Sequence, residues 1–293
     1  MKLTPIDRVS DISPEEFRER YLLPSKPVII TNLAHSWPAF TKWNWDFFKA
    51  LVGNVSVGVY NNVRACAKVP VNGADDTMLF GDYLDMIRSG PAALRIFLFN
   101  VFKHAPHIVV DFSFPTLIKG FLKRYPMLFV GGAGSIAHMH YDLDLSHIFH
   151  TQFIGRKRVL LLDNSQSPLI YKMPATVESA ASFVNWQDHL DTEHFPALEY
   201  AQAYETILEH GDTMFMPSGY WHHMQYMDSG FAMSLRALPE GLSPKINTLY
   251  HLLGMRGFNN MLIKMAPDWW YHYKRRYAQQ KANEAMQKLA VRR

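Results

Sequence analysis

The stretch that decides the fold is Ile148-Phe149-His150-Thr151-Gln152-Phe153-Ile154-Gly155-Arg156-Lys157-Arg158-Val159-Leu160-Leu161-Leu162. Its two halves are rich in β-branched, aromatic and leucine residues, which is typical of strands. Between them, Gly155 supplies the backbone freedom that a tight turn requires. The stretch therefore predicts a strand, a turn and a returning strand.

Short runs of this kind, separated by Gly, Pro, Asn and Asp, continue from Met127 to about Leu238. Such a texture is typical of a sandwich or a barrel. Upstream, helical and extended patterns alternate, and from Pro244 to the end apolar residues return at helical spacing. We therefore predict a mainly β fold with N-terminal α+β elements and C-terminal helices. The expected N-terminal elements are helices over Pro14–Leu22, Trp45–Leu51 and Phe80–Ser89, and strands over Pro27–Thr31, Val55–Tyr60 and Leu94–Phe99.

The composition favours one large folded unit. Of the 293 residues, 48% are hydrophobic and only 19% are charged, which is enough to bury a sizeable core and is unlike a disordered chain. The single cysteine, Cys66, excludes an internal disulfide framework and favours a reducing compartment. The first residues have no apolar segment for secretion, and no run of about 18 apolar residues could span a bilayer. We expect a cytoplasmic protein without a membrane partner.

The net charge of +4 is concentrated at one end, because Arg256 to Arg293 contains nine basic and two acidic residues. A basic segment can bind nucleic acid. This one lacks a groove-reading motif, so a solvated helix face is the favoured interpretation and nucleic acid is not the expected partner. The aromatic cluster Trp269 to Tyr273 suggests helices that cover the barrel or pair with a second subunit. We therefore expect a domain over residues 1–240 and a helical extension over 241–293 that forms a homodimer.

Histidines are clustered, since four lie between His138 and His150 and a pair, His222-His223, follows later. Residues two apart on an extended strand project from the same face, so His140 and Asp142 can reach one metal ion. His222, on a distant strand, supplies a third ligand. Two imidazoles and one carboxylate on one face of an octahedral ion are diagnostic of non-heme Fe(II) oxygenases. The predicted metal ligands and catalytic centre are His140, Asp142 and His222.

Two basic residues are candidates for binding an anionic co-substrate. Lys157 shares strand parity with apolar neighbours, so its ammonium is expected to face inward, where a charge needs an anion. Arg236 lies on the strand Phe231 to Leu238, on the same face as the small residues Ala232 and Ser234. Its planar guanidinium matches a carboxylate. Either residue could bind the distal carboxylate of 2-oxoglutarate.

At these residues the chain resembles the Jumonji C / cupin-like group of Fe(II)- and 2-oxoglutarate-dependent oxygenases. The resemblance is closest to the branch that contains the asparaginyl hydroxylase acting on hypoxia-inducible factor, and it covers roughly Pro14 to Leu238. It implies a double-stranded β-helix, or jelly roll, with the metal at His140, Asp142 and His222 and 2-oxoglutarate at Lys157. The matching segments, in the family's order, are Lys26–Ile30, Trp43–Trp45, His140–Asp142, Gly155–Arg158, Tyr204–Thr206, Gly211-Asp212 and Trp221-His222.

The chain also departs from the family pattern. The interval from His140 to Gly155 is two residues longer, so that Leu143-Asp144 resembles a local bulge and either Asp142 or Asp144 could be the carboxylate ligand. Ala137 stands where the closest relatives have a hydroxyl that helps to bind 2-oxoglutarate. Arg236 replaces a neutral amide, and His223 occupies a position that the family does not use as a ligand.

The resemblance implies an oxygenase that uses Fe(II), 2-oxoglutarate and O2 to hydroxylate a protein side chain, a peptide or a small molecule. Two alternatives stay open. One is a metal-binding cupin with other chemistry, in which His138, His147 or His150 is a fourth ligand. The other is a non-catalytic binding module whose basic C-terminal helix grips a partner.

Overall fold

The computed structural model describes residues 1–63, 73–176, 181–186 and 190–291, so Cys66 lies outside the described residues. Eight strands form the centre of the molecule, and successive strands are distributed between two sheets, one of seven strands and one of five. They are β7 (Met127–Gly131), β8 (Ile136–His140), β9 (His147–Ile154), β10 (Lys157–Leu162), β11 (Gln202–Leu208), β12 (Thr213–Met216), β13 (Trp221–Tyr226) and β14 (Gly230–Ala237).

The order of these strands is that of a double-stranded β-helix. The larger sheet contains β12-β9-β14-β7 and the smaller one β11-β10-β13-β8, with antiparallel neighbours. The turn at Gly155, where φ is 73°, joins β9 to β10. The predicted jelly-roll fold and its strand-turn-strand centre are therefore confirmed.

N-terminal elements enlarge both sheets. The larger sheet is extended by β6 (Arg95–Phe99) next to β7, and by β3 (Val28–Ile30) and β2 (Asp7–Val9) beyond β12. On the smaller sheet β1 (Lys2–Pro5) pairs with β11 in parallel, and β4 (Ser56–Val59) and β5 (Asp76–Leu79) form a separate hairpin. The intervening helices are α1 (Pro14–Phe17), which continues as the π-helical η1 (Arg18–Leu22), then α2 (Ala39–Lys42), α3 (Trp45–Val52) and α4 (Phe80–Ser89). The predicted α+β elements are confirmed.

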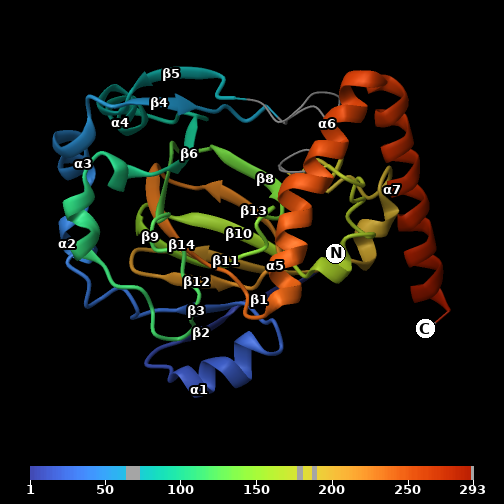
Figure 1. Cartoon of the computed structure of the whole chain (residues 1–293), viewed down its shortest axis with the longest axis horizontal. Helices are drawn as coiled ribbons and strands as arrows, with labels where there is room; N and C mark the ends of the chain where they lie inside the picture. Colours follow the sequence, from blue (N-terminus) through green and yellow to red (C-terminus); the bar gives the residue numbers. More distant parts are fainter. Residues whose placement is uncertain (64–72, 177–180, 187–189, 292–293) are drawn as a thin grey trace.

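Strand alternation separates the core from the cavity. On β9, Phe149 and Phe153 point outward into a core cluster that also contains Phe17, Trp43 and other side chains of the N-terminal helical region. On the same strand Ile148 and His150 line the cavity between the two sheets. The N-terminal helices thus cover the outer face of the larger sheet, with α2, α3 and α4 at the side of the barrel away from the C-terminus (Figure 1). This leaves the inner face for the site.

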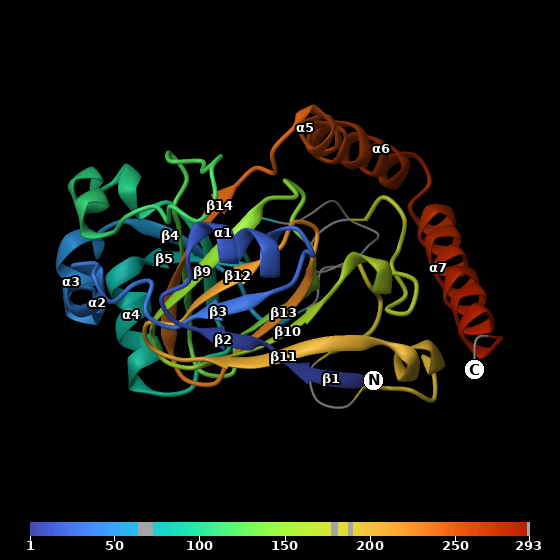
Figure 2. The same ribbon diagram turned by 90° about the horizontal axis from the view of Figure 1, so that it is seen from below.

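The predicted C-terminal helices are α5 (Leu242–Leu249), the π-helical η7 (Tyr250–Met255), α6 (Arg256–Met265) and α7 (Pro267–Ala290). They leave the barrel after β14, and Figure 2 shows α7 beside the end of the barrel where η6 (Pro196–Tyr200) lies. Ala278 and Ala282 of α7 are buried in a core cluster together with Ala197 and Leu198 of η6. Of the helices that the structure describes, none is both long and apolar enough to cross a membrane.

Candidate metal centre

A cavity of about 450 Å³ lies between the two sheets, and residues from seven of the eight central strands line it. His140, Asp142 and His222 share this cavity with both candidate co-substrate residues, Lys157 and Arg236. The structure therefore brings all five predicted site residues into one hollow.

The two histidines meet because β8 and β13 are neighbours. In their antiparallel register His140 stands opposite His222, and a register shift follows between His222 and Met224. The two ring centroids are 4.1 Å apart. One ligand atom from each of His140, Asp142 and His222 lies within 4.8 Å of the other two. This cluster of three is the one group of metal-ligand type found among the described residues.

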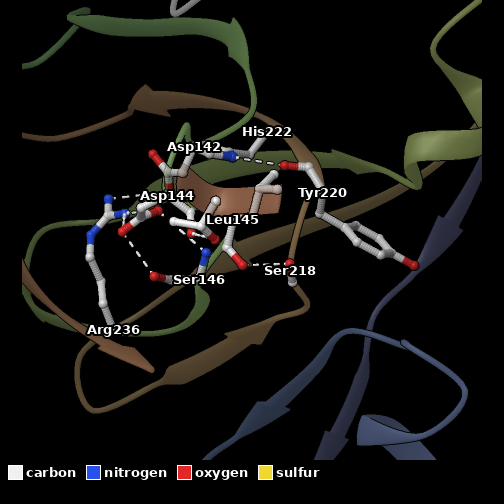
Figure 3. A network of polar contacts seen from close by, with 9 residues as sticks. Asp142, Asp144, Leu145, Ser146, Ser218, Tyr220, His222 and Arg236 are labelled. Atoms are coloured by element: carbon white, nitrogen blue, oxygen red, sulfur yellow. Dashed lines mark hydrogen bonds and ion pairs between the residues drawn. The ribbon is translucent and has the colours of Figure 1, made fainter. Parts of the chain in front are cut away.

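Strand parity predicted that Asp142 lies on the same strand as His140, but the structure places it in a loop. Strand β8 ends at His140, so Asp142 lies in the connection to β9 and not on a strand. Hydrogen bonds hold this connection: the Leu145 amide donates to the Asp142 carbonyl (3.1 Å), and the Ser218 hydroxyl donates to the Leu145 carbonyl (2.5 Å). Figure 3 shows Ser218 meeting Leu145 below the aspartates. The carboxylate is positioned by a fixed loop.

The protonation of the histidines suits a metal ligand. His140 Nδ1 donates to the His138 carbonyl (2.6 Å) and His222 Nδ1 to the Tyr220 carbonyl (3.3 Å). These bonds leave Nε2 of each ring with its lone pair, as in metal sites where a carbonyl orients the imidazole. Burial and the neighbouring His222 lower the pKa of His140 to about 3, and burial also lowers the pKa of His222. Both rings are neutral at neutral pH.

The two aspartates differ in what they contact. Asp144 accepts from Arg236 Nη1 with both oxygens (2.9 Å each) and from the Ser146 hydroxyl (2.8 Å). Asp142 Oδ2 lies 3.2 Å from Arg236 Nη2, yet this buried atom has no hydrogen bond of good geometry within the described chain. Figure 3 shows Arg236 facing both carboxylates. Both oxygens of Asp144 therefore accept hydrogen bonds, whereas Asp142 Oδ2 accepts none of good geometry within the described chain.

The charge of Asp142 is stabilised in the absence of any ion. Burial alone would raise the pKa of Asp142, but the guanidinium of Arg236 and the two imidazoles lower it below its usual range. Two neutral imidazoles and an ionised carboxylate, whose Oδ2 accepts no hydrogen bond of good geometry among the described residues, fit a divalent cation such as Fe(II). The residues present thus fit the predicted metal.

Lys157 faces the cavity, as its strand parity predicts. The side chain is 1% exposed, and its ammonium lies 3.0 Å from His150 Nε2 and 4.3 Å from the centre of the Tyr226 ring. No ion pair of Lys157 is recorded in the described part of the chain, and burial lowers the pKa of Lys157 to about 7. The cavity therefore contains a basic group without a counter-ion.

The sequence did not predict that His150 and Ser234 position the ammonium group of Lys157. His150 Nδ1 lies 2.8 Å from the Ser234 hydroxyl, because β9 and β14 pair with Ser234 opposite His150. In the sequence, the even-numbered positions of His150 and Ser234 on their strands indicate only that each can face the cavity. The strand register shows that the two side chains meet. The other two candidates for a fourth ligand also have partners elsewhere: His138 bonds the Asn62 carbonyl (2.7 Å), and His147 accepts from the Ser218 amide (3.1 Å).

Comparison with known proteins identifies a family for most of this chain. Residues 14–250 match a family described as the cupin-like domain. Lysine-specific demethylase JMJ30 of Arabidopsis thaliana is 25% identical over 236 residues, which are 78% of this chain and 54% of that protein. Lysine-specific demethylase 8 of Xenopus tropicalis is 23% identical over 239 residues (79% of this chain, 52% of that protein). Jumonji C domain-containing protein 5 of Drosophila melanogaster is 23% identical over 239 residues (76% and 57%). The chain spans about half the length of these relatives.

The different contacts of the two aspartates predict which of them binds the ion. We expect Asp142→Asn to lower the affinity for Mn(II) or Fe(II) by more than the roughly 10–100-fold that supporting residues contribute. Asp144→Asn should stay within that range, because its carboxylate only orients Arg236. Calorimetric titration of each variant with Mn(II) measures both effects. A larger loss for Asp144→Asn would show that Asp144 is the ligand.

Proposed function

Because this chain belongs to the family of cupin-like domains, we propose that it is an Fe(II)- and 2-oxoglutarate-dependent oxygenase. The observation that carries the proposal is the pairing, in one cavity, of a two-histidine, one-carboxylate cluster with a buried lysine that forms no ion pair with any described residue. A facial set of three protein ligands leaves three positions open, which is enough for a chelating co-substrate and O2.

In this proposal His140, Asp142 and His222 would hold the iron through their two imidazoles and one carboxylate. When bound, Fe(II) would activate O2, which is the oxidant, and 2-oxoglutarate would supply two of the four electrons that O2 accepts: 2-oxoglutarate, O2 and a substrate C–H bond give succinate, CO2 and a hydroxyl group. The protein's contribution is to bind, orient and exclude water. The ion pair with Arg236 orients the Asp142 carboxylate, and the apolar side chains of Phe129, Met216 and Met224 line the same cavity.

We assign the distal carboxylate of 2-oxoglutarate to Lys157. Both basic candidates face the cavity, but Arg236 is committed to two aspartates. Burial alone would lower the pKa of Arg236, yet Asp142 and Asp144 outweigh it and raise that pKa above its ordinary value. Lys157 has only the neutral His150 and the Tyr226 ring beside its ammonium. An incoming carboxylate would find its counter-ion at Lys157.

The substrate class concerns whether the site demethylates lysine or hydroxylates another C–H bond. Two of the relatives carry the name lysine-specific demethylase. Demethylation of this kind and side-chain hydroxylation both begin with insertion of oxygen into a C–H bond, so the same site could serve either. We propose hydroxylation of a protein side chain or of a small molecule, and placement in the asparaginyl hydroxylase branch stays a prediction.

Loss of one histidine tests the metal-dependent function. Under nitrogen, protein with Fe(II) should develop a weak visible charge-transfer band as 2-oxoglutarate is added, and in air it should release succinate. His222→Ala removes a ligand and should abolish both signals. His223→Ala, which changes the adjacent ring that faces away from the cluster, is the control. If His222→Ala keeps the band and succinate release, the proposal is wrong.

The assignment of Lys157 predicts how 2-oxoglutarate binding depends on pH. A bound carboxylate favours the protonated lysine, and the pKa of free Lys157 is about 7. The affinity should therefore be constant below pH 7 and fall by up to about tenfold per unit as pH rises above it. Anaerobic titration of the charge-transfer band from about pH 6 to pH 9 measures this. In Lys157→Arg, which stays charged, the dependence should vanish, and an unchanged slope there would contradict the assignment.

We also propose that a second copy of the chain covers the C-terminal helices. Ile246, Leu249 and Leu253 follow one another at helical spacing along α5 and η7, and they are 59%, 57% and 68% exposed. A stripe of this kind can pair with itself across a two-fold axis. The segment 241–293 would then serve as the dimerisation extension.

Light scattering during size-exclusion chromatography tests the dimer. The wild-type chain should elute at twice its mass of 33.8 kDa. The double variant Leu249→Glu/Leu253→Glu should elute as a monomer with unchanged 2-oxoglutarate binding, because the substitutions place charges in the interface. Val110→Glu, at a site 75% exposed on the N-terminal part, should remain dimeric. A monomeric wild-type protein would contradict the proposal.

A further inference from the structure

Arg95 is a cation in the cavity wall that the proposed reaction does not use. It begins β6, where its backbone exchanges two hydrogen bonds with Tyr60 (2.8 and 2.9 Å) and pairs with Gly131 of β7. Ile96 and Phe99 of the same strand belong to the core cluster, and the pairing of β6 with β7 is irregular between them. Arg95 and Phe97 line the same cavity as the metal cluster. The guanidinium is therefore fixed on a sheet that faces the site.

The charge of Arg95 is not compensated, in contrast to that of Arg236. The one side-chain hydrogen bond recorded for it runs from Nη1 to the Asn61 carbonyl (2.5 Å), and no carboxylate of the described residues lies within ion-pair distance. Burial lowers the pKa of Arg95, and the neighbouring Tyr226 and Asp75 offset this only in part. Asp75 itself is exposed and accepts a hydrogen bond from the Asn61 amide (2.9 Å). The adjoining sequence 64–72 contains no acidic residue.

A guanidinium partly withdrawn from water without a carboxylate is unfavourable, so its presence calls for a functional reason. The cavity contains two such groups, Lys157 and Arg95. In the proposed function the distal carboxylate of 2-oxoglutarate pairs with Lys157. Arg95 then remains without a counter-ion, and an anionic group that pairs with it would have to belong to the substrate.

The other charges of the cavity also disfavour a cationic substrate. Its lining carboxylates among the described residues are Asp75, Asp142 and Asp144, and the last two are bound to Arg236. Arg256 of α6 adds a further cation to the lining. The two positive charges of the metal and the two negative charges of 2-oxoglutarate cancel, so the cavity remains positive when both are bound. Among the described lining residues, a methylated ammonium would find only Asp75, which is exposed and lies beside Arg95, as a carboxylate that Arg236 does not bind.

We propose that Arg95 binds a carboxylate of the substrate, so that this protein acts on an acidic compound or acidic side chain and not on a methylated lysine. The inference rests on the proposed function, because that function assigns Lys157 to the co-substrate. A guanidinium binds a carboxylate through two parallel hydrogen bonds, which fixes the orientation as well as the position of the substrate.

Matched probes test the charge preference directly. The probes are glutamate, glutamine and dimethyllysine, each blocked as the N-acetyl amide, titrated calorimetrically into protein loaded with Mn(II) and 2-oxoglutarate. Since a hydrogen bond to a charged group is strong, the glutamate probe should bind roughly tenfold to a hundredfold more tightly than the isosteric glutamine probe. Arg95→Gln should remove this ratio and Arg95→Lys should retain part of it. Arg256→Gln, which removes a rim charge, should keep it.

Three results would overturn the inference: no binding of the glutamate probe, tightest binding of the dimethyllysine probe, or the same ratio in Arg95→Gln as in the wild type. Arg95 could instead anchor 2-oxoglutarate, and the charge-transfer titration separates the two roles. We expect Arg95→Gln to bind 2-oxoglutarate as the wild type does. A tenfold weaker affinity there, with the glutamate preference intact, would make Arg95 a co-substrate residue.

The same experiments distinguish failure of the inference from failure of the proposed function. If wild-type protein gives no charge-transfer band with Fe(II) and 2-oxoglutarate, the proposed function is wrong. If the band forms normally but the probes show no dependence on Arg95, only the inference is wrong. Thermal unfolding of each variant shows whether the substitution has disturbed the fold, and Arg95→Lys gives a second, charge-preserving variant.

Discussion

The site depends on the position of β13 between β8 and β10. This placement is a property of the double-stranded β-helix, and it puts His222 directly opposite His140, although 82 positions separate them in the chain. The same pairing puts Tyr226 opposite Lys157. Strand register thus determines both the metal cluster and the surroundings of the basic group, and a slip of one residue would turn every one of these side chains to the other face.

Electrostatics then divides the cavity into a compensated and an uncompensated part. Arg236 pairs with both aspartates at the end where the metal ligands lie. Lys157 and Arg95 have no carboxylate partner among the described residues, and burial lowers the pKa of each. Cations that are withdrawn from water without a counter-ion reduce stability. The presence of Lys157 and Arg95 in one cavity is the physical basis for expecting two anions there, one from the co-substrate and one from the substrate.

Much of this arrangement was accessible from the sequence, because period-two patterns report which side chains share a face. The Gly155 turn and the inward orientation of Lys157 follow from local patterns of this kind, whereas the distant partner His222 follows from the two-histidine, one-carboxylate set and the family resemblance. The position of Asp142 does not, since β8 ends at His140 and a loop bonded to Ser218 places the carboxylate. The contact of His150 with Ser234 depends on strand register, and parity alone cannot supply that.

Two departures from the family pattern, seen separately in the sequence, are one feature in the structure. The longer interval after His140 contributes Asp144, and an arginine stands at 236 in place of a neutral amide. Arg236 Nη1 lies 2.9 Å from both oxygens of Asp144. Arg236 and Asp144 are partly buried, with side chains 12% and 22% exposed, so either departure alone would leave an unpaired charge in the cavity wall. The pair satisfies Asp144, whereas Asp142 Oδ2 accepts no hydrogen bond of good geometry among the described residues, and this supports the proposed roles of Asp142 at the metal and of Lys157 at the co-substrate.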